Sequence, residues 1–141
     1  LCDSTQLVER MGDQRAAELF RRHDRLVRSL LAEQHGREID KTDGFLLLFE
    51  RPVQAIGFAL QYQRRLREFA QDTGAAMAAR IGIHVGDVMV WDNSAEDIAQ
   101  GAKPVEVEGL AKPVAARMMG LALPGQILLS KVAADLARRG M

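Results

Sequence analysis

Hydrophobic residues in the first third of the chain follow the period of an α-helix. Between Asp13 and Gly36, apolar residues recur every three or four positions, with His23 among them, and arginines fill many of the remaining positions. This spacing predicts a long amphipathic helix with one buried stripe. Residues 6–12 are predicted to form a shorter helix before it.

The next segment predicts a β-hairpin. Residues 37–42 and 45–50 are two short runs separated by Asp43-Gly44, a dipeptide typical of tight turns because glycine tolerates a positive φ. Pro52 follows, and proline is tolerated in the first turn of a helix. We therefore expect a hairpin and then a helix from Pro52 to about residue 71.

The second half of the chain predicts a more irregular order of elements. Residues 78–90 alternate apolar with polar or small residues, as in a strand, and the phase slips near Gly86, which predicts a bulge. Residues 91–103 are polar and without periodicity, which indicates an exposed excursion. The remaining elements are a strand over 104–108, a helix over 110–121, a strand over 126–129 and a final helix capped by Ser130.

This order predicts a single α/β (α+β) domain over residues 1–141. Leu1-Cys2 resembles the end of a strand whose beginning is absent, so the full order becomes β-αα-ββ-α-β-β-α-β-α. A ferredoxin-like split βαβ arrangement is the simplest fold that accommodates it, with a mostly antiparallel sheet and helices packed on one face. The other face could bind a partner.

Composition narrows the class of protein. The chain has 48% hydrophobic and 27% charged residues, which is typical of one globular domain. Its 19 basic and 19 acidic residues balance, so no net field favours nucleic acid or an anionic membrane as partner. The single cysteine excludes an internal disulfide and a cysteine zinc site, and fits a reducing, cytoplasmic setting. No apolar run is long enough to span a membrane.

Asp43 is the first candidate functional residue. A carboxylate at the tip of a rigid hairpin is well placed to bind a cation or to orient a substrate. The alternative is that Asp43 only makes the turn, because Asp-Gly turns are common. His84 is predicted to pack or to form a hydrogen bond, since the other two histidines lie far away in the sequence and no zinc site is suggested.

Four segments, residues 3–13, 41–49, 80–87 and 109–130, resemble the class III adenylate/guanylate cyclase catalytic domain in their order and motifs. The most specific are Arg-Ile-Gly-Ile-His-Val-Gly-Asp at 80–87, and Ala-Ala-Arg-Met at 115–118 followed by Pro-Gly-Gln-Ile-Leu-Leu-Ser at 124–130. The resemblance covers nearly the whole chain.

The resemblance implies an enzyme that converts a purine nucleoside triphosphate to a 3′,5′-cyclic monophosphate and pyrophosphate, in cyclic-nucleotide signalling. It implies a homodimer with catalytic sites at the interface, and further regulatory domains in the full protein. Two divalent ions, Mg or Mn, would be held by two aspartates, since such hard ions prefer oxygen ligands. Asp43 matches the second aspartate. The first is expected just upstream of Leu1, and a phosphate-binding lysine beyond Met141, so the chain looks truncated at both ends.

The resemblance also assigns roles to three further residues. Arg117 matches the arginine that stabilises the transition state, a role that suits a permanently charged planar guanidinium; the alternative is an ordinary exposed helix arginine. Lys41 and Glu106 are the nearest matches to the purine-selecting pair and weakly favour ATP over GTP. Because the hairpin is one residue shorter than usual, either Asp40 or Lys41 could take the first position of that pair. Lys41 could equally be a solvated lysine at a strand end.

Pro113 departs from the resemblance. It lies four residues before Arg117, on the same helical face, where the family carries an asparagine that orients the ribose. Proline has no N–H donor and cannot replace that asparagine chemically. A second hypothesis is therefore a catalytically degenerate cyclase-fold module that senses nucleotide or dimerises.

Overall fold

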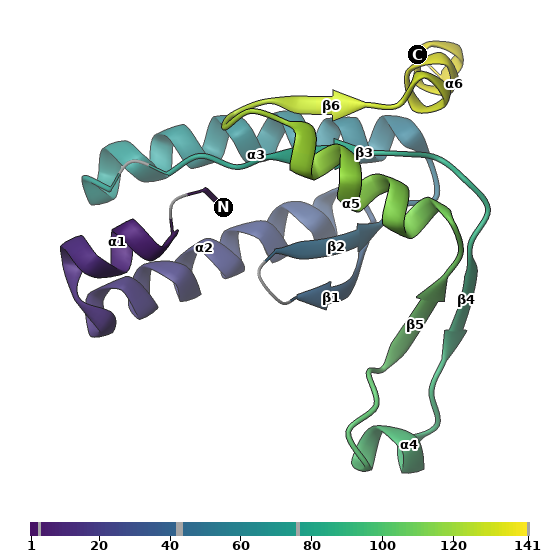
Figure 1. Cartoon of the computed structure of the whole chain (residues 1–141), viewed down its shortest axis with the longest axis horizontal. Coiled ribbons are helices and arrows are strands. Elements are labelled where there is room, and N and C mark those ends of the chain that lie inside the picture. The colour runs from purple at the N-terminus through teal and green to yellow at the C-terminus, as the bar shows by residue number, and fades with distance from the viewer. Residues whose placement is uncertain (3, 42–43, 76, 141) are drawn as a thin grey trace.

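The computed structural model describes residues 1–2, 4–41, 44–75 and 77–140. Figure 1 shows the arrangement of its elements. The helices in the described part are α1 (Ser4–Met11), α2 (Asp13–Glu33), α3 (Pro52–Thr73), α4 (Ala95–Ala99), α5 (Ala111–Leu121) and α6 (Lys131–Gly140). The strands are β1 (Arg37–Lys41), β2 (Phe45–Leu48), β3 (Ile81–Ile83), β4 (Met89–Asp92), β5 (Val105–Glu108) and β6 (Ile127–Leu129).

The two long helices, α2 and α3, supply most of the main core. The predicted stripe of α2 is buried, His23 included. Its last two turns pack against an aromatic and aliphatic stripe of α3; the cluster comprises Val27, Leu30, Leu31, Phe58, Tyr62, Leu66 and Ala79. Pro52 occupies the first turn of α3, as predicted, and Gly74 ends the helix in the left-handed conformation at φ 72°. The hairpin packs against this pair of helices.

The strands form three separate pairs in the described part of the chain. β1 and β2 pair antiparallel, as predicted, with a register shift between Glu38 and Asp40. β3 pairs parallel with β6, and β4 pairs antiparallel with β5. The predicted mixed α/β class is confirmed, and two of the three pairs are antiparallel; in the described residues they are separate short pairs.

The single strand predicted over residues 78–90 is wrong in extent. β3 covers three residues, and the chain pairs again only at Met89, with a different partner strand. The intervening loop packs instead against the residues that follow β5: a Cβ at Gly109 would lie 2.9 Å from the carbonyl oxygen of Asp87, and a Cβ at Gly86 would lie 3.0 Å from that of Ala111. The phase slip near Gly86 is therefore a break between two strands and not a bulge in one.

Residues 89–108 form an arm that projects from the body of the molecule (Figure 1). β4 and β5 are its two sides, and α4 closes its tip, where the Ser94 side chain caps the helix by accepting from the Asp97 N–H at 3.1 Å. The predicted exposure of this excursion is confirmed, although it contains a short helix. Among the described helices, none has the length and hydrophobicity that a membrane crossing requires.

Candidate active site

Helix α5 carries Arg117 and lies directly on strand β3. The contact depends on Gly82, because a Cβ at that position would lie 2.4 Å from the backbone nitrogen of Met119 and 2.8 Å from the carbonyl oxygen of Ala115. Distances below about 3 Å from backbone atoms require movement of the backbone, so only glycine fits here. Helix α5 of the same chain therefore covers β3 at Gly82.

The Arg117 side chain is exposed on α5. No carboxylate of the described residues lies within ion-pairing distance of it. Pro113 is the third residue of the same helix, where a missing N–H costs no intrahelical hydrogen bond. The helix therefore tolerates proline here and presents its arginine to solvent, where a phosphoryl group could be bound.

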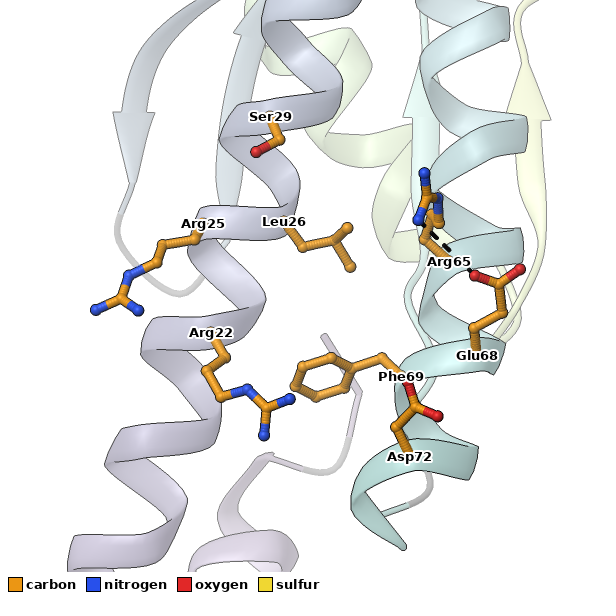
Figure 2. A pocket seen from close by; sticks show the side chains of 8 residues that line it. All are labelled: Arg22, Arg25, Leu26, Ser29, Arg65, Glu68, Phe69 and Asp72. Atoms are coloured by element: carbon orange, nitrogen blue, oxygen red, sulfur yellow. Dashed lines mark ion pairs between the residues drawn. The ribbon is translucent and has the colours of Figure 1, made fainter.

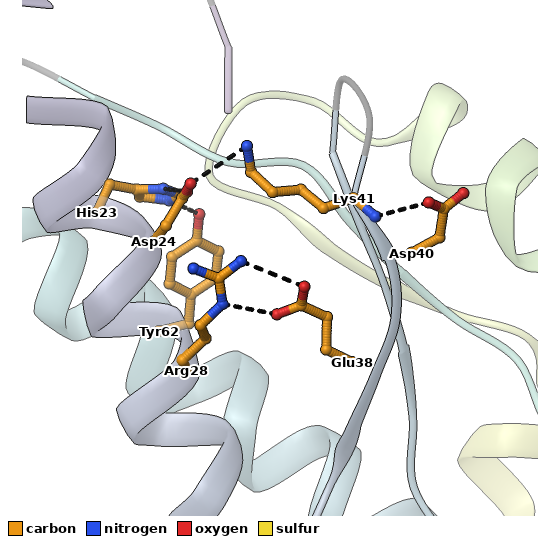
Figure 3. Close-up of polar contacts among 7 residues, drawn as sticks. All are labelled: His23, Asp24, Arg28, Glu38, Asp40, Lys41 and Tyr62. Atoms are coloured by element: carbon orange, nitrogen blue, oxygen red, sulfur yellow. Dashed lines mark hydrogen bonds and ion pairs between the residues drawn. The ribbon is translucent and has the colours of Figure 1, made fainter. Parts of the chain in front are cut away.

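The hairpin is joined to α2 and α3 by a chain of polar contacts (Figure 3). The Lys41 ammonium lies 3.2 Å from one carboxylate oxygen of Asp24, whose other oxygen lies 3.0 Å from Nδ1 of His23. Nε2 of His23 is hydrogen-bonded to the Tyr62 hydroxyl on α3. His23 is only 3% exposed, so this network fixes the end of β1 against the helix layer.

The network also fixes the protonation of its buried members. Burial lowers the pKa of His23 below its usual range, against the opposing effect of Asp24. Burial likewise raises the pKa of the Tyr62 hydroxyl. Because a carboxylate can only accept, we assign the proton of neutral His23 to Nδ1, which donates to Asp24, and Nε2 then accepts from the Tyr62 O–H.

Asp40 and Lys41 lie on opposite sides of β1 (Figure 3). The Asp40 carboxylate lies 3.0 Å from the Lys103 ammonium, next to β5 on the arm, and this hydrogen bond lowers the pKa of Asp40. A second ion pair between strand and arm joins Arg37 to Asp92 at 3.3 Å. Of the two residues that the sequence left open, Asp40 is thus the one that contacts the arm.

Glu106 lies on β5 and is half-buried. Its carboxylate accepts a long hydrogen bond of 3.4 Å from the side-chain amide of Asn93. Strands β1 and β5 contact each other, but Lys41 is paired with Asp24, and no hydrogen bond or ion pair in the described region joins Lys41 to Glu106. The structure therefore brings the hairpin close to β5 without bringing the two predicted purine-selecting side chains together.

The sequence matches no protein-family model and no curated protein. Solved structures do match. The adenylyl cyclase CyaB from P. aeruginosa aligns with a TM-score of 0.82 and 15% identity, over 98% of this chain and 76% of that one. The guanylate cyclase domain of RhGC from Catenaria anguillulae, in complex with GTP, aligns at 0.80 and 15%, over 96% and 76%. The non-canonical dimeric guanylyl cyclase domain of the RhoGC fusion protein from Blastocladiella emersonii aligns at 0.83 and 14%, over 98% and 79%.

The chain has the fold of an adenylyl or guanylyl cyclase catalytic domain. The resemblance seen in the sequence is thereby confirmed at the level of fold. Within this cyclase fold, Arg117, Lys41 and Glu106 lie on α5, β1 and β5, which are three separate elements. Asp43, the predicted metal ligand, lies outside the described residues.

No group of three or more histidine, cysteine, aspartate or glutamate side chains in the described residues could hold a metal ion. These residues alone do not fit a divalent-metal site, so the predicted Mg or Mn depends on Asp43 and stays a prediction.

Two predictions about single side chains are confirmed. His84 is a hydrogen-bonding residue, because its Nδ1 lies 2.8 Å from the Ser130 hydroxyl. Ser130 also caps α6, accepting from the Ala133 N–H at 3.2 Å. Sequence reasoning missed Asp24 and Lys103, which contact the hairpin from its two sides. The only sequence signal that could have identified Asp24 is that it directly follows His23, a residue of the buried stripe of α2.

Proposed function

We propose that the protein is a nucleotide cyclase, which converts a purine nucleoside triphosphate to a 3′,5′-cyclic nucleotide and pyrophosphate in cyclic-nucleotide signalling. The observation that carries the proposal is the exposed Arg117 on a helix packed directly against β3, within a cyclase fold. We place this activity in the cytoplasm. ATP is weakly preferred over GTP as substrate, from the chemistry of Lys41 and Glu106.

In the proposed reaction, the ribose 3′ oxygen attacks the α-phosphate and pyrophosphate leaves. Negative charge grows on the phosphoryl oxygens, and Arg117 donates hydrogen bonds to them without changing its own protonation. Lys41 and Glu106 are assigned to the purine edge, which requires Lys41 to leave Asp24 when nucleotide binds. Mg or Mn belongs to the proposal as the partner of Asp43, and no step is derived through it.

We propose a homodimer as the working form, with the sites at the interface and further regulatory domains in the full protein. The arm and α5 support this through exposed apolar side chains, which in water favour a protein partner. These residues include Met89 at 70%, Trp91 at 43%, Leu110 at 84% and Leu121 at 70% relative exposure. One structural neighbour is itself described as a non-canonical dimeric guanylyl cyclase domain, so it supports dimerisation of the fold and not this placement of the sites.

The test is an assay of the full-length gene product with ATP or GTP and manganese, with the cyclic product separated by chromatography. Arg117→Ala is expected to lower turnover by about 10²–10³-fold, because a donor to a developing oxyanion is lost. Arg138→Ala, at an exposed arginine of α6, is the matched control and should keep full activity. A folded dimer that gives no cyclic product with either nucleotide would overturn the proposal.

A second candidate function is a nucleotide-sensing or dimerising module without turnover. Two observations favour it: Pro113 stands where a ribose-orienting asparagine is expected, and the Lys41 ammonium is paired with Asp24. Calorimetry, which measures nucleotide binding and dimerisation, distinguishes the two candidates when it is combined with the assay of cyclic product. The module should bind nucleotide or dimerise without releasing cyclic product, whereas the enzyme should bind nucleotide and release cyclic product in the assay above.

A further inference from the structure

Strand β1 is held from two sides by ion pairs. Its charged residues are paired either with α2 or with the arm, and the register shift between Glu38 and Asp40 places these two residues on different sides. The pairs are Glu38–Arg28 and Lys41–Asp24 toward α2, and Arg37–Asp92 and Asp40–Lys103 toward the arm. The Lys41 side chain is therefore on the side of β1 that faces α2.

This position separates Lys41 from its proposed partner at the purine. Glu106 lies on β5, which forms one side of the arm, and Asp40 is the residue of β1 that contacts the arm. The Lys41 ammonium instead lies 3.2 Å from a carboxylate oxygen of Asp24 on α2 (Figure 3). In this state, a purine that is bound beside Glu106 would not meet the ammonium group.

Asp24 is the fixed member of its pair with Lys41. Its second oxygen lies 3.0 Å from Nδ1 of His23, and Nε2 of His23 is bound to the Tyr62 hydroxyl. The side chain of Asp24 is 17% exposed, whereas that of Lys41 is 38% exposed. A lysine has a long and flexible stem, so Lys41 is the member of the pair that can move.

The charge of Asp24 is matched by Lys41 alone among the described residues, because its other polar partner, His23, is neutral. Arg22 and Arg25 are neighbours of Asp24 on α2, but both line a groove between α2 and α3 (Figure 2). Neither arginine lies within 4 Å of a carboxylate in the part of the chain that the structure describes. Lys41 therefore has no competitor for Asp24.

We propose that Asp24 is a positioning residue, which holds Lys41 away from the purine until nucleotide binds. This inference rests on the proposed cyclase function and adds a control of the same site. A purine must draw the ammonium away from Asp24, so only the molecules with a free Lys41 bind the purine fully. The apparent affinity is lowered by the fraction of such molecules. An ion pair of this exposure should change that affinity by about three- to fivefold.

The test is calorimetry of the full-length protein with manganese and adenosine 5′-(α,β-methylene)triphosphate, an analogue that cannot release pyrophosphate. Asp24→Asn keeps the size of the side chain and an oxygen that accepts from His23, and it removes the charge that holds Lys41. The variant should bind the analogue about three- to fivefold more tightly than the wild type. With ATP as substrate, KM should fall by a similar factor and kcat should change little.

Two controls separate this effect from a general effect of charge on an anionic nucleotide. Glu38→Gln breaks the other ion pair between β1 and α2, with the same loss of one negative charge, and should bind the analogue like the wild type. Lys41→Met removes the lysine that Asp24 holds. Adding Asp24→Asn to Lys41→Met should therefore give no further gain in affinity.

The proposal is overturned if Asp24→Asn binds the analogue no more tightly than the wild type. An equal gain in Glu38→Gln, or a gain that persists beside Lys41→Met, would also overturn it. The wild-type protein gives an independent measurement, because the NMR signal of the Lys41 Cε methylene should shift when the analogue is added, and an unshifted signal would contradict the release of Lys41. Binding without turnover would overturn the cyclase activity alone, so the two failures are distinguishable.

Discussion

Substitution Gly82→Ala tests whether close packing of α5 on β3 positions Arg117. The added Cβ would lie 2.4 Å from the Met119 nitrogen and 2.9 Å from the Met118 carbonyl carbon, both backbone atoms of α5. Ordinary contacts of a Cβ begin near 3.4 Å, so the helix must move outward by about 1 Å at that point. Because Arg117 lies in the same turn, it moves with the helix.

The size of the effect follows from overpacking. A side-chain atom forced against backbone costs about 1–3 kcal/mol of unfolding free energy. At roughly 4 °C per kcal/mol for a domain of this size, the melting temperature should fall by about 4–12 °C. Cyclase turnover should fall further than the folded fraction does, since a misplacement of about 1 Å in a positioned group can cost 10²-fold.

Gly120→Ala is the matched control, on the same helix. A Cβ at Gly120 meets nothing within 4 Å, and its φ is not positive, so alanine should raise helix stability by about 0.5–1 kcal/mol. Urea unfolding of both variants, with turnover measured at a temperature where both are folded, gives the result. A Gly82→Ala protein with wild-type stability and turnover would refute the close contact between β3 and α5.

Two further predictions concern buried polar contacts. The pKa of His23 is lowered in the fold, so its contribution to the unfolding free energy should be complete above pH 6.5, the pKa of the unfolded chain, and should decline as the pH falls toward the lower pKa of the folded state. His23→Gln should flatten this decline, whereas His35→Gln, at an exposed histidine, should keep it. An unchanged slope in His23→Gln would contradict the burial of a neutral His23. Ser130→Ala should cost about 0.5–2 kcal/mol in urea unfolding by removing the cap of α6 and the partner of His84, and a loss near zero would exclude that role.

All described helices except the short α4 could be predicted closely, because their signals are local. The three-to-four spacing gives α2, and Pro52 marks the start of α3 to the residue. The strand over 78–90 could not be predicted in extent, since it depends on which strand each half pairs with. Periodicity within a segment does not contain that information.

The candidate site was predictable only in part. The motif around Arg117 identifies that residue, and its exposure on α5 agrees with a role in binding. The direction of Lys41 was not predictable, because it depends on the register shift between Glu38 and Asp40. An irregularity of one residue exchanges the faces of a strand, and here Lys41 contacts Asp24 while Asp40 contacts the arm.

The most direct test of the central claim is cyclic-nucleotide production by the full-length protein and its Arg117→Ala variant, at equal folded concentration. We expect cyclic product from ATP or GTP with manganese, and a loss of about 10²–10³-fold in the variant, whose melting temperature stays near the wild type because the side chain is exposed. Equal turnover in both proteins, or no cyclic product from a folded wild-type dimer, would contradict it.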